Sequence, residues 1–229
     1  MALTQPSGST RYTYDFVTSA LPVAAGRILE IGCGDGALAA SLQADGLDVL
    51  AIDSDPQAVE TAKAAGVDAR LLEWPCAIGT AFDAVLFTRS LHHIEPLDHA
   101  VEAAKQALRP GGRLIVEDFR AEGGDDAGER WFAGRARALI DQGALDATLD
   151  KLLERLGPGD HDLHSSSAIA AALGTIGSVD ATGAAYYFRY FEPHLRCPAQ
   201  ADELLAEEVS LISARSIEAL GKRFVVASG

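Results

Sequence analysis

The sequence contains few cysteines, a minority of basic residues among its charges, and no recognisable internal repeat. Its three cysteines form no CxxC pair, so neither a disulfide framework nor a zinc site is expected. Nineteen Lys and Arg against 33 Asp and Glu give a formal net charge of −14, which repels phosphate backbones. No cluster of basic residues interrupts this balance. We therefore expect no nucleic-acid partner and no metal, and small molecules are the better candidate ligands.

The sequence also lacks long apolar runs. No segment approaches the roughly 20 apolar residues that a membrane-spanning helix needs, and residues 1–8 have neither the basic nor the apolar region of a signal peptide. A mean hydropathy of +0.09 is instead typical of a globular protein. Its length of 229 residues suits one α/β domain. We expect a single cytoplasmic domain over residues 1–229, monomeric or homodimeric, with no membrane partner.

Three alternating glycines, Gly32, Gly34 and Gly36, follow an apolar strand predicted at 27–31 and precede a helical pattern. Glycine lacks a Cβ, so such a turn can adopt positive φ and a ligand can approach its bare backbone. The helix that follows presents unpaired N–H groups and the positive end of its dipole to the turn. The segment therefore predicts a binding site for a ligand with an anionic group, such as a carboxylate or a phosphate.

The glycine spacing fits more than one cofactor. Gly32, Gly34 and Ala37 satisfy the relaxed dinucleotide fingerprint. Asp53 follows about 20 residues later, where an acid that binds ribose is expected. An NAD-type dinucleotide is therefore compatible with this segment, and spacing alone does not decide between it and other cofactors.

Strand and helix signals alternate through the first half of the chain. Strands are predicted at 27–31, 47–52, 67–72, 82–88 and 113–117, and helices at 37–43, 56–65 and 97–108. Gly66 ends the second of these helices and residues 110–112, Pro-Gly-Gly, end the third. This alternation predicts an α/β fold with a parallel, doubly wound sheet.

Three segments resemble motifs of one enzyme family and occur in the family's order. Residues 28–36 (ILEIGCGDG) look like the first motif of class I S-adenosylmethionine (SAM)-dependent methyltransferases. Residues 82–94, which begin FDAVLF and end LHHI, resemble its fourth-strand motif, and residues 108–116 (LRPGGRLIV) resemble its turn into the fifth strand. The resemblance covers about residues 25–120. It implies a Rossmann-like seven-stranded sheet, mostly parallel with an antiparallel last strand, and SAM as cofactor, with S-adenosylhomocysteine (SAH) as product.

The resemblance implies a position for each part of the cofactor. Gly32, Gly34 and Gly36 would face the methionine portion of SAM, whose carboxylate can meet the helix N-terminus. Glu30 would support this region near the cofactor's amino group. Asp53, at the end of the second strand, would bind both ribose hydroxyls, because an ionised carboxylate has two acceptor oxygens.

The same resemblance implies residues for the adenine and for the methionine side. Glu73 would receive the adenine amino group, and Trp74 would lie over the ring. The segment from Glu73 to the fourth strand is shorter than is common in the family, so Asp68 is an alternative acceptor. Thr88, Arg89 and Ser90, at the end of the fourth strand, would line the methionine moiety, and an ordinary loop is the alternative.

Histidines near the fourth strand are the candidate catalytic residues. Methyl transfer from a sulfonium needs in-line alignment more than acid–base groups, and proximity can supply much of the rate. A base is needed only when the acceptor must lose a proton, for which histidine is suited near neutral pH. His93 is our candidate, and a capping or packing role for His92 and His93 is the alternative. His161 and His164 fit either an acceptor pocket or a surface loop.

The second half of the chain lies beyond the family motifs. Helices are predicted around residues 131–140, along the leucine repeat at 145–156, and at 165–173 behind a serine cap. The aromatic run at 186–191 and residues 224–226 are predicted to form the sixth and seventh strands.

Two segments, about 119–160 and 192–220, are then helical insertions relative to a minimal fold. Open α/β sheets bind ligands at the carboxyl ends of their strands. We expect the two insertions to lie there and to form a lid over the substrate.

These patterns predict a methyltransferase that moves a methyl group from SAM to an oxygen, nitrogen or carbon of a small molecule. Two alternatives remain. One is an NAD-type oxidoreductase, which the glycine spacing allows and the second and third motifs disfavour. The other is a SAM-binding protein that transfers no methyl group. The acceptor itself depends on segments without a recognisable pattern.

Overall fold

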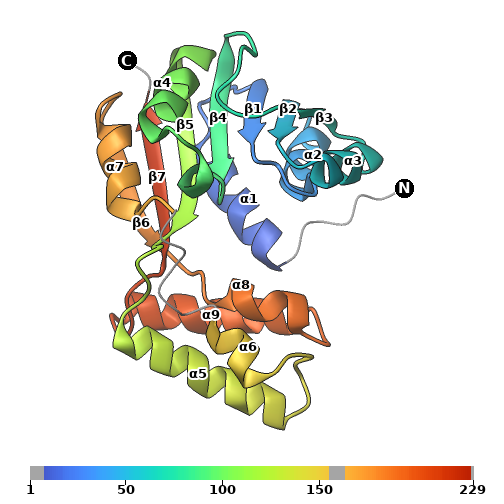
Figure 1. Ribbon diagram of the computed structural model, residues 1–229, viewed down its shortest axis with the longest axis vertical. Helices are drawn as coiled ribbons and strands as arrows, with labels where there is room; N and C mark the ends of the chain where they lie inside the picture. The colour runs from blue at the N-terminus through green and yellow to red at the C-terminus, as the bar shows by residue number, and fades with distance from the viewer. Residues whose placement is uncertain (1–7, 155–162, 228–229) are drawn as a thin grey trace.

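The computed structural model of the protein describes residues 8–154 and 163–227. Within these residues a seven-stranded sheet has the order β3-β2-β1-β4-β5-β7-β6 (Figure 1). Its strands are β1 (Arg27–Ile31), β2 (Asp48–Asp53), β3 (Asp68–Leu71), β4 (Phe82–Thr88), β5 (Leu108–Phe119), β6 (Val179–Ala184) and β7 (Gly221–Ala227). β7 is antiparallel to both neighbours, and the remaining pairs are parallel. The predicted doubly wound fold is confirmed.

Helices cover both faces of the sheet, which explains its uninterrupted apolar strands. On one face lie α1 (Gly8–Ala20), α2 (Ala37–Ala44) and α3 (Pro56–Ala64), and on the other lie α4 (Leu97–Ala107) and α7 (Ser166–Gly174) (Figure 1). Successive side chains of β4 alternate between the two cores: Ala84 and Leu86 join the first, and Val85 and Phe87 the second. The sheet is thereby fixed as a rigid platform whose strand ends can position a site.

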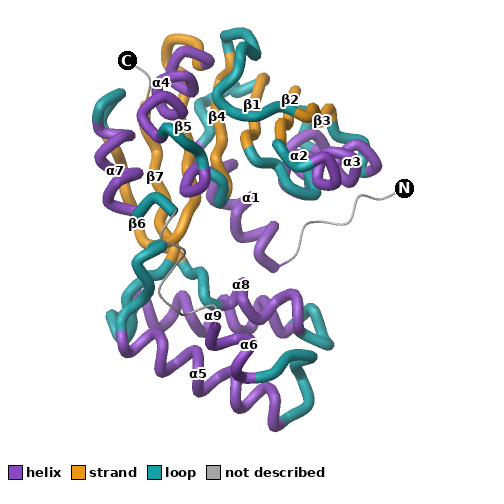
Figure 2. The backbone as a smooth tube through the Cα atoms, in the orientation of Figure 1, coloured by secondary structure: helices purple, strands orange, loops and turns teal. Residues whose placement is uncertain are grey.

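A separate helical layer lies beyond the carboxyl ends of the strands (Figures 1 and 2). It consists of α5 (Asp126–Asp141), α6 (Leu149–Leu153), α8 (Phe188–Phe191), the 3-10 turn η3 (Glu192–His194) and α9 (Gln200–Ser213). Its core is aromatic: Phe132 stacks on Phe191 with ring centroids 4.5 Å apart, and Tyr187 is fully buried between the helices. The layer therefore packs around a core of its own.

A buried carboxylate fixes the start of α8. Glu208 of α9 accepts hydrogen bonds from the backbone N–H groups of Tyr186 (2.6 Å), Tyr187 (3.0 Å) and Phe188 (2.9 Å). These are N-terminal donors that the helix itself leaves without a partner. Glu208 is 0% exposed, so its contacts join α8 to α9 inside the layer.

The predicted strand at 186–191 is wrong, because this aromatic run forms α8. Its rings are buried among the helices of the layer, and Glu208 caps its first turn, so tertiary contacts outweigh strand propensity. The sixth strand is instead β6, which lies at the edge of the sheet. Most of its side chains are exposed, so it shows no apolar pattern in the sequence.

Other boundaries also differ from the sequence pattern. The helix predicted from Leu145 begins only at Leu149, capped by Thr148, because Leu145 forms a bridge to Leu195. The end of that leucine repeat lies outside the described residues. The serine-capped helix is confirmed as α7, with Ser165 Oγ accepting from Ala168 N at 3.1 Å. Helix α1 was not predicted. No helix in the described ranges is long and apolar enough to cross a membrane.

Candidate functional site

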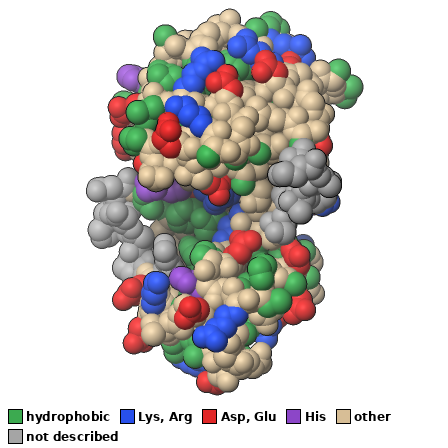
Figure 3. Space-filling model, turned by 90° about the vertical axis from the view of Figure 1, so that its right-hand side faces the viewer, with side chains coloured by type: hydrophobic (Ala, Val, Ile, Leu, Met, Phe, Trp, Pro, Cys, Tyr) green, Lys and Arg blue, Asp and Glu red, His purple; other side chains and the backbone are tan. Residues whose placement is uncertain are grey.

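Two adjoining cavities open at the carboxyl ends of β1 and β4, where the strand order reverses and open α/β sheets bind ligands. The larger, about 410 Å³, runs from the ends of β1 and β2 to residues 72–74 and 89–95. The smaller, about 350 Å³, lies between α1, the glycine turn and the end of β4. Gly32, Gly34 and Arg89 line both. Figure 3 shows the molecule hollowed between the sheet and the helical layer, with histidine, apolar and basic side chains at the walls.

Glycine is favoured at the three positions of the turn for different physical reasons. All have positive φ, of 75°, 55° and 76° along the chain. A Cβ on Gly32 would lie 2.4 Å from Ser90 Cβ, and one on Gly36 would lie 2.7 Å from Ala62 Cβ. At Gly34 no described atom lies within 4 Å of that position. Gly32 and Gly36 are thus required by packing, and Gly34 exposes bare backbone to open space.

Asp53 is fixed beside this open backbone. Its Oδ2 accepts from Gly34 N at 2.9 Å, and its Oδ1 accepts from Asp55 N at 2.9 Å. Each carboxylate oxygen has a further lone pair, so the group can still accept from a diol in the larger cavity. The structure therefore brings Asp53 and Gly34 together at the larger cavity.

The two candidate acids for adenine lie in different places. Glu73 lines the larger cavity together with Asp53. Asp68 is not among the lining residues and faces Arg70, with an N–O distance of 3.1 Å. The geometry therefore favours Glu73.

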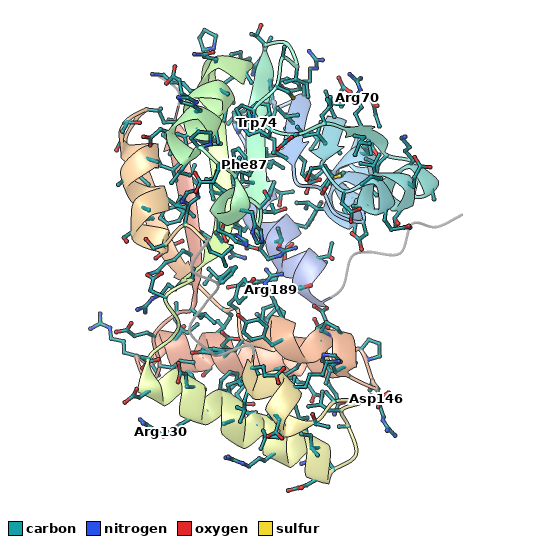
Figure 4. The ribbon with its side chains drawn as sticks, viewed as in Figure 1. Arg70, Trp74, Phe87, Arg130, Asp146 and Arg189 are labelled. Atoms are coloured by element: carbon teal, nitrogen blue, oxygen red, sulfur yellow. The ribbon has the colours of Figure 1, made fainter. Side chains whose placement is uncertain are left out.

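Trp74 contributes to the core as well as to the cavity wall (Figure 4). Its indole Nε1 donates to the carbonyl of Ala100 in α4 at 3.1 Å, and its ring meets Phe87 edge-on at 6.5 Å. These contacts hold the ring under α4. Its predicted position over an adenine ring stays a prediction.

Glu30 is a buried carboxyl group at the smaller cavity. Thr88 Oγ1 donates to its Oε1 at 3.3 Å, and its Oε2 has no hydrogen-bond partner among the described residues. Burial raises the pKa of Glu30 to about 8. An unsatisfied buried oxygen is costly, and a cationic donor such as an ammonium group would satisfy it. Glu30 and Thr88 therefore lie together at the predicted side of the site.

A charged network, here named the Glu117 cluster, joins α1, the strand ends and α8; it consists of Thr13, Arg89, Glu117, Arg189 and Arg223. Glu117, 1% exposed, accepts from Thr13 Oγ1 at 2.6 Å and contacts Arg189 at 2.7 Å, Arg223 at 2.6 Å and Arg89 at 3.3 Å. Burial acts to raise the pKa of Glu117, but Arg189 and Arg223 outweigh it and lower that pKa. Figure 4 shows Arg189 between the sheet and the helical layer. No sequence pattern predicts that these residues meet, because they are far apart along the chain.

The histidines occupy distinct environments. His93, in the 3-10 turn η1 (Leu91–His93), is exposed and lines the larger cavity. His92 is buried, with Nδ1 2.7 Å from Asp118 Oδ1. His164 lies beside this turn, and its backbone N–H donates to the carbonyl of His92 at 2.9 Å. His161 lies outside the described residues. Of the two neighbouring histidines, His93 therefore lines the larger cavity, whereas His92 is packed in the interior.

Ring contacts lead from the histidine turn to the helical layer. His92 meets Phe119 at 4.8 Å, Phe119 meets Tyr186 at 4.9 Å, and Tyr186 meets Tyr190 at 5.5 Å between centroids. Burial raises the pKa of Tyr186 above its ordinary range. The end of β5 and the start of α8 thus share one aromatic surface near the cavities.

The cysteines are free thiols. Cys33 in the glycine turn is buried, and this burial raises its pKa to about 12, which keeps it a thiol at neutral pH. In the part of the chain that the structure describes, no group of three or more His, Cys, Asp or Glu side chains could hold a metal ion.

Comparison with known proteins shows that part of this chain is similar to methyltransferases. Residues 29–114 match the family model described as a methyltransferase domain. The ubiquinone biosynthesis O-methyltransferase of Xylella fastidiosa is 33% identical over 115 residues, which cover 44% of this chain and 45% of the relative. The match thus spans about half the length of the curated relatives.

Solved structures extend the likeness to nearly the whole chain. A SAM-dependent methyltransferase of Thermotoga maritima, described as a possible histamine N-methyltransferase, has a TM-score of 0.59 at 15% identity, covering 94% of this chain and 87% of that one. A SAM-dependent methyltransferase of Archaeoglobus fulgidus has a TM-score of 0.59 at 11% identity, covering 96% and 95%. Identities this low establish the fold. The chain therefore has the fold of these SAM-dependent methyltransferases, and its residues 29–114 match a methyltransferase-domain model.

Proposed function

We propose that this protein transfers a methyl group from SAM to an oxygen, nitrogen or carbon atom of a small molecule. One observation carries the proposal: Gly34 exposes bare backbone beside Asp53 at the junction of two cavities, within the segment that matches a methyltransferase domain. A ligand with a nucleoside at one end and an amino acid at the other suits two cavities that meet at a glycine turn.

In this proposal the residues of the two cavities have separate tasks. Asp53 holds the ribose and Glu73 the adenine in the larger cavity, where Trp74 forms part of the wall. Glu30 and Thr88 hold the amino group in the smaller cavity. SAM, when bound, supplies a methyl group on a sulfonium. His93, which lines the larger cavity, would accept a proton from an acceptor that must lose one.

We propose further that residues 119–160 and 192–220 form a lid within a single domain over residues 1–229. Helices of both segments pack in the helical layer at the carboxyl ends of the strands. The aromatic surface from Phe119 to Tyr190 then contacts the acceptor. A ubiquinone-type relative that methylates oxygen supports a small-molecule acceptor without fixing its atom.

Calorimetry with SAM, SAH and NADH tests the cofactor. We expect the first two to bind with micromolar dissociation constants and NADH not to bind. Preferential binding of NADH would overturn the proposal in favour of an oxidoreductase. If SAH binds but labelled methyl never leaves SAM with any of a broad panel of alcohols, phenols, amines and carbon acids, the protein binds SAM without transferring its methyl group.

Asp53→Ala tests the ribose contact. We expect SAM binding to weaken by about 1–3 kcal/mol, because both hydroxyls lose a charged acceptor. Asp68→Ala is the matched control, since it removes an exposed acid outside the cavity and should leave binding unchanged. Equal losses in both variants would contradict the assignment of Asp53 and restore Asp68 as a ligand.

A further inference from the structure

Arg89 has a backbone conformation that needs an explanation. It follows β4 with φ of 65°, a left-handed conformation that costs free energy in a residue with a Cβ. Its own N–H donates to the carbonyl of Glu117 at 2.6 Å, and its Nη1 contacts Thr13 Oγ1 at 3.2 Å and Glu117 Oε1 at 3.3 Å. Such strain persists where surrounding contacts hold it, and it is typical of ligand-binding positions.

Arg89 is also the arginine of the Glu117 cluster that reaches the cavities. The side chains of Arg189 and Arg223 are 8% and 13% exposed, whereas that of Arg89 is 36% exposed and lines both cavities. Its two contacts within the cluster use the same nitrogen, Nη1. A guanidinium has five N–H donors in a fork that matches a carboxylate.

The charges of the cluster do not cancel. Three guanidinium groups meet one carboxylate, Glu117. Two further acids near the cluster do not add to this carboxylate: Glu208 holds three backbone N–H groups of α8, and burial raises the pKa of Glu30 to about 8, so it is largely neutral at pH 7. Asp35 and Asp53 line the cavities beside the glycine turn, outside the cluster. Within the cluster itself positive charge therefore exceeds negative charge, and an anion beside Arg89 would balance it.

The N–H groups of the glycine turn are largely occupied. Gly34 N donates to Asp53, Gly36 N to the carbonyl of Cys33, and Ala37 N to Asp35 Oδ1. A carboxylate at this place consequently finds few free amides at the start of α2. It needs a side-chain cation.

We propose that Arg89 binds a ligand carboxylate at the junction of the two cavities. The inference rests on the proposed function. Two sources can supply the carboxylate: the amino-acid end of the cofactor, or the acceptor. Glu117 and Thr13 are positioning residues that hold the guanidinium in place.

Calorimetry with SAH and its decarboxylated analogue, S-adenosyl-3-thiopropylamine, tests whether the cofactor supplies the carboxylate that Arg89 binds. If the carboxylate is the cofactor's, the native protein binds SAH at least tenfold more tightly than the analogue, and Arg89→Gln removes this difference by weakening SAH alone. Arg89→Lys should restore part of it, because it keeps the charge and loses the fork. Arg109→Gln, which removes a comparably exposed arginine paired with Asp83 away from both cavities, should retain the full difference.

Titration of the SAH complex with benzoate, benzylamine and benzyl alcohol tests whether the acceptor supplies the carboxylate that Arg89 binds. If the carboxylate is the acceptor's, benzoate binds best, Arg89→Gln abolishes its binding, and SAH affinity is unchanged. If Arg89→Gln alters neither SAH nor benzoate binding, the inference is overturned. Thermal unfolding checks that the Gln variant is folded. If it is not, the Lys variant decides: it should either discriminate less than the native protein between SAH and the analogue or bind benzoate less tightly, and no change in either would overturn the inference. Failure of SAH to bind the native protein would instead overturn the proposed function.

Discussion

The glycine-turn side of the molecule and the helical layer are built in different ways. On the first side, residues 28–36 are contiguous, and backbone shape makes the site: Gly34 is bare, and Asp53 holds its N–H. In the layer, side chains distant in sequence make the structure, as when Glu208 caps α8 or Phe132 stacks on Phe191. The proposed cofactor site is therefore specified by a short motif, whereas the proposed acceptor side depends on packing between residues that are far apart in the sequence.

The largest effect expected in the helical layer comes from Glu208→Ala. Three N–H groups of α8 would be left buried without an acceptor, so the free energy of unfolding should fall by about 3–4 kcal/mol in urea titrations. Glu208→Gln keeps one acceptor oxygen and should lose less. Because the damage lies in the layer, the folded fraction should still bind SAH. Loss of SAH binding by folded Glu208→Ala would show that the two regions are not separable.

The next largest effects are expected from two alanine substitutions in the glycine turn, at Gly32 and at Gly34. Gly32→Ala should lower the free energy of unfolding by about 3 kcal/mol, because its Cβ would overlap Ser90. Gly34→Ala faces open space and should cost only about 1 kcal/mol, for the positive φ. Yet Gly34→Ala should lose SAH binding, which calorimetry measures. Equal stability losses, or unchanged binding in Gly34→Ala, would contradict the distinct roles assigned to these glycines.

A smaller, pH-dependent effect is expected at Glu30. Its folded-state pKa of about 8 lies above the ordinary 4.5, so between these values the folded protein holds a proton that the unfolded chain releases. The free energy of unfolding of the ligand-free protein should therefore fall as pH rises from about 5 to 8. Glu30→Gln should remove this fall, which urea titrations at the two pH values measure. A fall of the same size in the Gln variant would assign it to another group.

The regions also differ in how far the sequence predicts them. The glycine turn and the strands from Arg27 to Thr88 follow from local spacing. The resemblance to methyltransferases implies Asp53 and Glu73 as residues of one site, and both line one cavity because parallel strands end at a common edge. The helix at residues 188–191 does not, because its aromatic run has strand propensity and only Glu208, some 20 residues later, specifies the helix start. The meeting of Arg89 with Glu117 and the other arginines was not predicted for the same reason, since it is a product of the assembled fold.

The pairing of β5 with β7 limits how this protein could be divided into fragments. In the register of β5 with β7, Glu117 stands opposite Arg223, and the guanidinium of Arg223 closes on that carboxylate. The match to the methyltransferase-domain model ends at residue 114, so a fragment cut to that match would lack Glu117 and both of its buried arginines. During synthesis, likewise, the cation at the cavity junction acquires its full support only after the last strand has been translated. The recognisable motif is thus made before most of the site, and β7 is the strand that completes it.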